Sequence, residues 1–124
     1  MARHADLWNA NGTPDVIRAS GAVLGEACRA IGRDPGAIEW TVTLNVAVRD
    51  DRDAAEAAFA AVLAHNSPQQ RERDLDAAGS PAEVAAVLRS YADAGIGHAM
   101  WVLRPPWDLE TIRRAGEVRA ALGA

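Results

Sequence analysis

The pattern of apolar and polar positions predicts helices and strands that alternate along the chain. Thr13-Pro14 is typical of a helix start, because the threonine hydroxyl can cap the first turn and proline loses no hydrogen bond there. Gly32 is expected to end this helix, and Pro35 prevents its continuation. A set of residues at helical spacing predicts a single apolar face for the helix: Val16, Val23, Leu24, Ala27, Cys28 and Ile31.

Between Ile38 and Val48 the period changes to strict alternation, which predicts a strand. The even-numbered positions are apolar, whereas Glu39, Thr41, Thr43 and Asn45 are expected on the other face. A doubly wound sheet is covered by helices on both faces and favours apolar residues on both, but a barrel interior tolerates Thr and Asn near its mouth. The polar positions therefore favour a barrel.

The second half of the chain continues the alternation. Residues 50–53 are expected to turn the chain and cap a helix over about 54–65. The polar stretch 66–78 has no clear period and is predicted to be irregular or partly helical. Residues 98–103 form a short apolar run, typical of a parallel strand covered by helices.

The sequence predicts two further helix starts. Ser80 and Glu83 have the spacing of a capping box, in which each side chain binds the other residue's backbone amide. Asp108 is expected to cap the last helix. The predicted inner face of that helix consists of Ile112, Ala115, Val118 and Leu122. With a strand-like stub over 5–9, the order of elements indicates βαβ units and a parallel α/β fold.

Composition narrows the class of protein. The 124 residues are 49% hydrophobic and 24% charged, which is typical of one globular domain. The net charge of −4, without a basic cluster, disfavours nucleic-acid binding. No apolar run has the length of a membrane span, so no membrane association is expected. The single cysteine excludes an internal disulfide and favours a reducing compartment, so a cytoplasmic location is predicted.

Several segments resemble luciferase-like monooxygenases, the family of bacterial luciferase and of many flavin- and deazaflavin-dependent oxidoreductases. The segments lie in the family's order and cover nearly the whole chain: ARHADLWN at 2–9, CRAIGRDP at 28–35, GSPAEV at 79–84 and YADAGIGH at 91–98. The resemblance implies a partial (β/α) TIM-type barrel, comprising about the last three βα units, with helices on one side of parallel strands. Residues 1–124 are thus identified as a C-terminal fragment of a luciferase-like (β/α)8 barrel domain.

The resemblance also implies a cofactor, either FMN or coenzyme F-420. The intact enzyme would activate oxygen with the flavin or transfer hydride with the deazaflavin. Trp8 and Asn9, at the end of the first strand stub, are the implied cofactor-binding residues, although Trp8 filling the barrel mouth is an equal alternative. Asn45 and Arg104 are candidates for binding substrate, with a structural hydrogen bond and an exposed arginine as their alternatives.

Motifs that carry chemistry independently of a family are absent from the sequence. There is no glycine-rich phosphate loop, no paired-cysteine or HExxH metal pattern and no GxSxG elbow, so no metal site and no catalytic residue are assigned. Cys28 is interpreted as a core residue and His65 as solvated or capping a helix end. His98 opens a strand, and barrel chemistry lies at the other end of strands, so it is assigned a structural role.

Three hypotheses of function follow. The chain is the C-terminal part of a luciferase-like oxidoreductase, inactive in isolation; or a non-catalytic truncated or interaction subunit; or an unrelated α/β binding module, which the ordered segments disfavour. Three strands leave two open edges, so an N-terminal barrel partner chain or self-association is expected. Two identical copies would supply only about six strands, fewer than the eight of a complete barrel.

Overall fold

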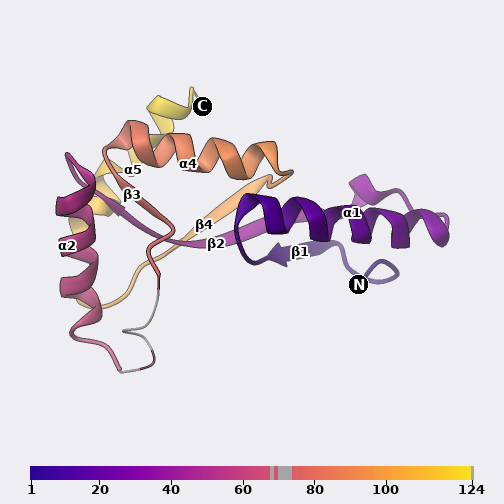
Figure 1. The fold of residues 1–124 in the computed structure, drawn as a ribbon, viewed down its shortest axis with the longest axis horizontal. Coiled ribbons are helices and arrows are strands. Elements are labelled where there is room, and N and C mark those ends of the chain that lie inside the picture. The colour runs from indigo at the N-terminus through magenta and orange to yellow at the C-terminus, as the bar shows by residue number, and fades with distance from the viewer. Residues whose placement is uncertain (68, 70–73, 124) are drawn as a thin grey trace. The chain divides into compact units, whose positions relative to one another are not determined.

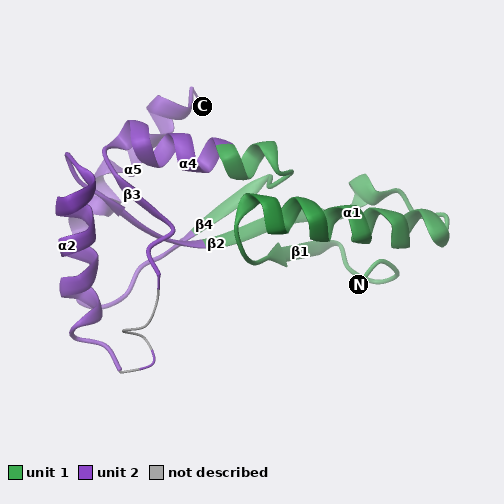
Figure 2. Cartoon of the chain, viewed as in Figure 1, with its two compact units in different colours: residues 1–43, 90–100 green, residues 44–89, 101–124 purple. Residues whose placement is uncertain are grey.

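The structure is a computed structural model that describes residues 1–67, 69 and 74–123. The chain divides into two compact units, which Figure 2 colours separately and which are described one by one below. Unit 1 comprises residues 1–43 and 90–100, and unit 2 comprises residues 44–89 and 101–124.

Each described strand is followed by a helix, so the structure contains four βα units (Figure 1). This number differs from the three units that the sequence predicted. The elements are β1 (Leu7–Ala10), α1 (Pro14–Ala30), β2 (Glu39–Val48), α2 (Arg52–Leu63), β3 (Ala77–Gly79), α4 (Pro81–Asp93), β4 (His98–Val102) and α5 (Leu109–Leu122). A 3-10 turn over Pro35–Ala37 precedes β2. No helix in the described part of the chain is long and apolar enough to cross a bilayer.

The long strand β2 pairs with each of the other three strands. It runs parallel to β1, with Leu7 opposite Glu39, and parallel to β3, with Val46 opposite Ala77. β4 pairs with β2 rather than with β3. The parallel α/β fold expected from the alternation of elements is therefore confirmed for the β1–β2 and β2–β3 pairs.

Strand β3 lies in the stretch that was expected to be irregular. Two alanines and a glycine have little preference for a strand, so their sequence carries no strand signal. Pairing with β2 imposes the extended conformation: Asp76 N–H donates to Asn45 O, and Arg49 N–H donates to Gly79 O, both at 2.9 Å. Residues 68 and 70–73 of the same stretch lie outside the described residues.

The predicted helix starts are confirmed by their caps. Thr13 accepts a hydrogen bond from a backbone amide of the first turn of α1, and Asp108 does the same for α5. The capping box at α4 is reciprocal, since Glu83 Oε2 accepts from Ser80 N at 2.8 Å and Ser80 Oγ accepts from Glu83 N at 3.3 Å. The hydrogen bonds that Glu83 Oε2 accepts from the backbone amide and the hydroxyl group of Ser80 lower the pKa of Glu83. Asp51 caps α2, which therefore begins at Arg52, two residues earlier than expected.

In unit 1, the prediction of a single apolar face on α1 is only partly correct. Leu24 and Cys28 are buried as expected, together with Ile17, Gly21 and Gly25. However, Val16, Val23 and Ile31 are 52%, 67% and 44% exposed. Helix α1 thus carries two apolar stripes, and glycines on one of them allow the sheet to approach that side closely.

The indole of Trp40 on β2 occupies the space beside two of the glycines in unit 1. A Cβ atom at Gly21 would lie 1.9 Å from Trp40 Cη2, and one at Gly95 would lie 3.0 Å from the same ring. Gly95 also has a φ of +102°, which disfavours other residues. Trp8 meets Trp40 edge to face, with ring centroids 4.9 Å apart. Both indoles pack against the buried cluster of Leu24, Cys28 and Ile38.

In unit 2, small residues bring α2 close to the strands. Ala47 of β2, Ala55 of α2 and Ala78 of β3 form a buried cluster, with Phe59 and Leu75 at its border. The inner face of α5 differs from the prediction, because Val118 is buried but Ile112 is 44% exposed. Thr111 takes its place in the interior, where hydrogen bonds satisfy its hydroxyl group.

We expect Gly21→Ala to lower the free energy of unfolding by about 1–2 kcal/mol, because the added methyl group must displace the Trp40 ring at a greater cost than the gain in helix propensity. Gly25→Ala is the matched control on the same helix. Its Cβ would lie 3.4 Å from the nearest atom, Arg29 Nη1, so we expect it to leave the stability unchanged or raise it by up to about 1 kcal/mol. Urea unfolding of both variants measures this, and equal effects would contradict the close packing of Trp40.

Candidate functional site

The polar face of the strands in unit 1 carries a small hydrogen-bonded group. Asn9 of β1 lies beside Thr41 and Thr43 of β2. Thr41 Oγ1 donates to Asn9 Oδ1 at 3.2 Å, and Asn9 Nδ2 donates to Thr43 Oγ1 at 3.3 Å. Thr41 is buried, whereas Asn9 is exposed. The two threonines therefore orient an amide group that remains accessible to a ligand.

Trp8 lies on the opposite face of β1 from Asn9, because successive residues of a strand point to opposite faces. Its indole packs with Trp40 against the apolar cluster of unit 1. The two residues implied as cofactor-binding thus do not share a face of the strand. The structure gives Trp8 a packing role, and its contact with a cofactor stays a prediction.

In unit 2, the two predicted substrate-binding residues lie together. Arg104 Nη1 donates to Asn45 Oδ1 at 2.6 Å. Asp76 Oδ2 accepts hydrogen bonds from Asn45 N at 2.6 Å and from Asn45 Nδ2 at 3.2 Å. Asp76 was missed in the sequence because it falls in the stretch expected to be irregular. The group combines a cation, an anion and an amide, and its arginine is suited to a carboxylate or phosphate.

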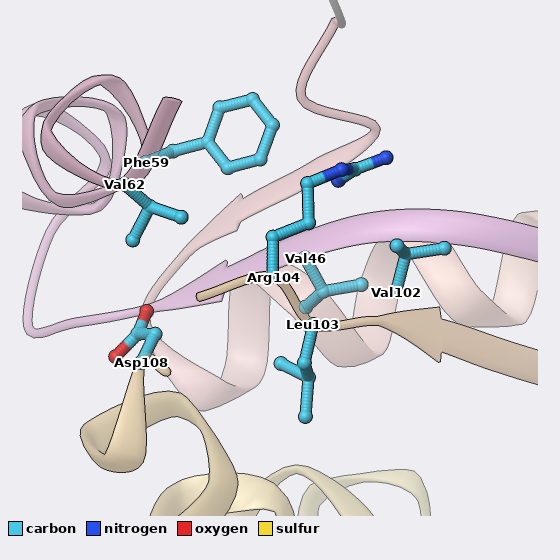
Figure 3. Close-up of a pocket in the computed structure, with 7 residues that line it drawn as sticks. All are labelled: Val46, Phe59, Val62, Val102, Leu103, Arg104 and Asp108. Atoms are coloured by element: carbon cyan, nitrogen blue, oxygen red, sulfur yellow. The ribbon is translucent and has the colours of Figure 1, made fainter. Parts of the chain in front are cut away.

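A small cavity lies beside this group, at the end of β4 (Figure 3). Val46, Phe59, Val62, Val102 and Leu103 supply its apolar lining, and Arg104 and Asp108 lie at its border. Figure 3 shows the charged ends of these two side chains pointing to different sides. The cavity volume is about 10 Å³, which is room for about one water molecule and much too small for a flavin ring.

The end of β2 is joined to the start of α5 by a buried network. Thr111 Oγ1 accepts from Val48 N at 2.9 Å and from Arg49 Nη1 at 3.1 Å, and it donates to Asp108 Oδ2 at 2.7 Å. Arg49 Nη2 donates to Asp108 Oδ1 at 2.9 Å. Each of these polar groups has a partner, so the network stabilises the contact between the carboxyl end of β2 and the start of α5.

Asp108 titrates below the ordinary aspartate range. Burial by itself raises the pKa of this carboxyl group, but the hydrogen bonds from Arg49 and Thr111, together with the charge of Arg49, outweigh burial and lower it. The carboxylate is therefore ionised at neutral pH and serves as the fixed anion of the network.

The cysteine and two of the histidines make packing or hydrogen-bonding contacts within the fold. Cys28 is fully buried in the core of unit 1, as expected. His65 Nδ1 lies 2.9 Å from Ala61 O near the end of α2, consistent with the expected capping role. His98 is the first residue of β4, and its Nδ1 lies 3.4 Å from Glu39 Oε1. Within the described ranges, no three His, Cys, Asp or Glu side chains are grouped so that they could hold a metal ion.

Three solved structures have a similar fold. A riboflavin lyase with a modified FMN and its substrate riboflavin matches 98% of this chain at 12% identity, with a TM-score of 0.74. A long-chain alkane monooxygenase matches 98% at 16% identity, with a TM-score of 0.69. A coenzyme F-420-dependent tetrahydromethanopterin reductase from Methanopyrus kandleri matches 80% at 17% identity, with a TM-score of 0.58. At these identities the likeness establishes the fold alone.

The chain spans only about two fifths of these enzymes. It covers 39% of the riboflavin lyase, 37% of the alkane monooxygenase and 40% of the reductase. No family model matches the sequence, and no curated protein matches it either. The similarity of fold therefore concerns part of each enzyme, and the activity of the whole enzymes does not transfer to this chain directly.

We expect Thr111→Val to lower the free energy of unfolding by about 2–3 kcal/mol, because the buried Val48 amide loses its acceptor and Asp108 loses a donor. Thr111→Ser is the matched control, since it keeps the hydroxyl group and loses only a methyl group, for about 0.8 kcal/mol. Denaturant unfolding distinguishes the two. An equal loss in both variants would mean that the hydroxyl group contributes nothing.

The lowered pKa of Asp108 makes stability depend on pH. A carboxyl group whose pKa is lower in the folded state stabilises the fold above its unfolded pKa, at about pH 4, and this contribution is lost as pH falls through the folded pKa. We therefore expect the difference in unfolding free energy between wild type and Asp108→Asn to be largest near neutral pH and to shrink below about pH 4. Parallel stability curves for the two proteins would contradict the ionised network.

Proposed function

We propose that the chain is the C-terminal part of a luciferase-like flavin- or coenzyme F-420-dependent oxidoreductase, incomplete as an enzyme on its own. The observation that carries the proposal is the match of 98% of this chain to about two fifths of a riboflavin lyase and of an alkane monooxygenase. The ordered sequence segments support the same family independently. Neither argument depends on a single residue.

The residues present fit part of such a cofactor. The oriented amide of Asn9 has both a donor and an acceptor, which suits the polar edge of a flavin or deazaflavin ring. Arg104, held by Asn45, suits an anionic group of the substrate or cofactor. The sequence has no glycine-rich loop to hold a phosphate, so that part of the site must come from elsewhere.

The chain's own residues would act by positioning. When bound, the cofactor supplies the redox chemistry, namely oxygen activation for a flavin or hydride transfer for the deazaflavin. Asn9 would orient the ring edge, with Thr41 and Thr43 holding the amide in one rotamer. Arg104 would offset negative charge on the bound molecule. Trp8, which packs behind β1, would keep the strand and therefore Asn9 in place.

A non-catalytic interaction subunit is the second candidate. Two observations favour it: the cavity beside Arg104 is only about 10 Å³, and the polar groups of the Asn45 cluster bind one another. A site that is closed and internally satisfied gains little from a ligand unless other chain segments open it.

Titration of the purified chain with oxidised FMN, reduced FMN and coenzyme F-420 tests the proposal, with the fluorescence of its four tryptophans as the signal. Because part of the site is missing, we expect saturable quenching with a dissociation constant of about 0.1–1 mM for one of the cofactors. Asn9→Ala should weaken binding about 3- to 10-fold, the equivalent of one hydrogen bond.

Glu26→Ala, on an exposed position of α1, is the control and should leave the affinity unchanged. A parallel titration of N-acetyltryptophanamide corrects for light absorbed by the cofactor. If a folded sample, verified by circular dichroism, gives no saturable response up to about 1 mM of any cofactor, the interaction-subunit alternative replaces the proposal.

A further inference from the structure

The side-chain amide of Asn45 lies between an acceptor and a donor of unit 2. Asp76 Oδ2 accepts from Asn45 Nδ2 at 3.2 Å, and Arg104 Nη1 donates to Asn45 Oδ1 at 2.6 Å. A carboxylate only accepts hydrogen bonds, and a guanidinium group only donates them. The amide therefore has a single orientation that satisfies both neighbours, with its nitrogen towards Asp76 and its oxygen towards Arg104. The reversed amide would place two acceptors opposite each other at one end and two donors at the other.

Asp76 also holds the backbone of Asn45. The same Oδ2 atom accepts from Asn45 N at 2.6 Å, and Asp76 N donates to Asn45 O at 2.9 Å. In a parallel pair, a backbone carbonyl of the neighbouring strand ordinarily accepts such an N–H group. The carboxylate takes the place of that carbonyl one residue before β3 begins. Asn45 is thus fixed by Asp76 at its amide nitrogen, its backbone nitrogen and its carbonyl oxygen.

Arg104 lies just beyond the carboxyl end of β4, with Asp108 at the border of the same cavity. The carboxylate of Asp108 is bound by Arg49 Nη2 at 2.9 Å, and Figure 3 shows the charged ends of Arg104 and Asp108 pointing to different sides. The guanidinium group is therefore oriented by Asn45 and not by Asp108. A guanidinium fork in a fixed position suits the paired oxygens of a carboxylate or phosphate group.

We propose that Asp76 is a positioning residue, which acts through Asn45 to hold the guanidinium group of Arg104 in position for an oxyanion of the ligand, either a carboxylate or a phosphate. This inference rests on the proposed function, in which Arg104 offsets negative charge on the bound molecule. A long side chain loses conformational freedom when it binds a ligand, and an arginine that is already fixed loses less. Asp76 thus strengthens binding, although its own negative charge opposes an anion.

Two variants of Asp76 separate positioning from charge. Asp76→Asn removes the charge but keeps an amide oxygen that can accept the same two hydrogen bonds from Asn45. Asp76→Ala removes both the charge and the acceptor. An effect of charge alone would make both variants bind an anion more tightly, whereas positioning weakens binding in Asp76→Ala only. Asp74→Ala, at an exposed position two residues earlier, is the control for the loss of a charge in the same segment.

Titration of the purified full chain with inorganic phosphate and, separately, with acetate at constant ionic strength tests the proposal without any cofactor. The NMR signals of the Arg104 Nε–H group and of the Asn45 side-chain amide report binding at this site. We expect saturable shifts in wild type with a dissociation constant of about 10 mM for the preferred anion, which distinguishes a phosphate from a carboxylate ligand. Asp76→Ala should raise this constant about 3- to 10-fold, the cost of ordering one long side chain. Asp76→Asn should leave the constant unchanged or lower it.

Circular dichroism spectra that match wild type verify that the variants are folded. Asn45→Ala also breaks the link between Asp76 and Arg104, so it replaces Asp76→Ala if that variant does not fold, with the same expected weakening. Equal affinities of Asp76→Ala and Asp76→Asn overturn the positioning role, as does an equal weakening in Asp74→Ala. A folded wild-type chain whose Arg104 signal responds to neither anion up to about 100 mM overturns the proposal as a whole, while the FMN and F-420 titration still tests the proposed function separately.

Discussion

The ten residues of strand β2 present an apolar face to one side of the sheet and a polar face to the other, and the pairing of the other strands depends on both faces. All three other described strands pair with it. One face of the strand carries Trp40, which fills the space beside Gly21 and Gly95 in unit 1. The other face carries Thr41 and Thr43, which hydrogen-bond Asn9. A shift of one residue in the pairing would exchange these two faces, so packing and polar contacts specify the same register.

The polar side chains at and near the strands have two different roles, namely stabilising the fold and offering contacts to a ligand. The network of Arg49, Asp108 and Thr111 is largely buried and satisfied, so it stabilises the contact between the end of β2 and the start of α5. Asn9 is exposed and Arg104 is half-buried, and these two residues carry the proposed contacts with a cofactor or substrate. In unit 2 the candidate residue Arg104 precedes the stabilising residue Asp108 by four positions, so only their hydrogen-bond partners separate the two roles.

The exposed apolar side chains of α1 favour cover by a further protein segment. The chain spans only about two fifths of three enzymes that share its fold. The cost of leaving Val16 and Val23 in water is the physical reason to expect another segment on this face. A cofactor site built from strand ends becomes larger when more strands surround it.

The helix caps and the longest strand could be predicted from the sequence alone. The caps at Thr13, Ser80 and Asp108 depend on residues three positions apart, and the strand over 39–48 on its own alternation, so both could be predicted without knowing the rest of the fold. Tertiary structure alone decided three other features. Strand β3 exists because β2 pairs with it. Helix α1 turns one of its two apolar stripes inward because the glycines on that stripe leave room for Trp40. Trp8 lies on the packed face of β1 because pairing with β2 sets the register of that strand. Each of these depends on residues more than a helical turn apart, whose contacts no local pattern encodes.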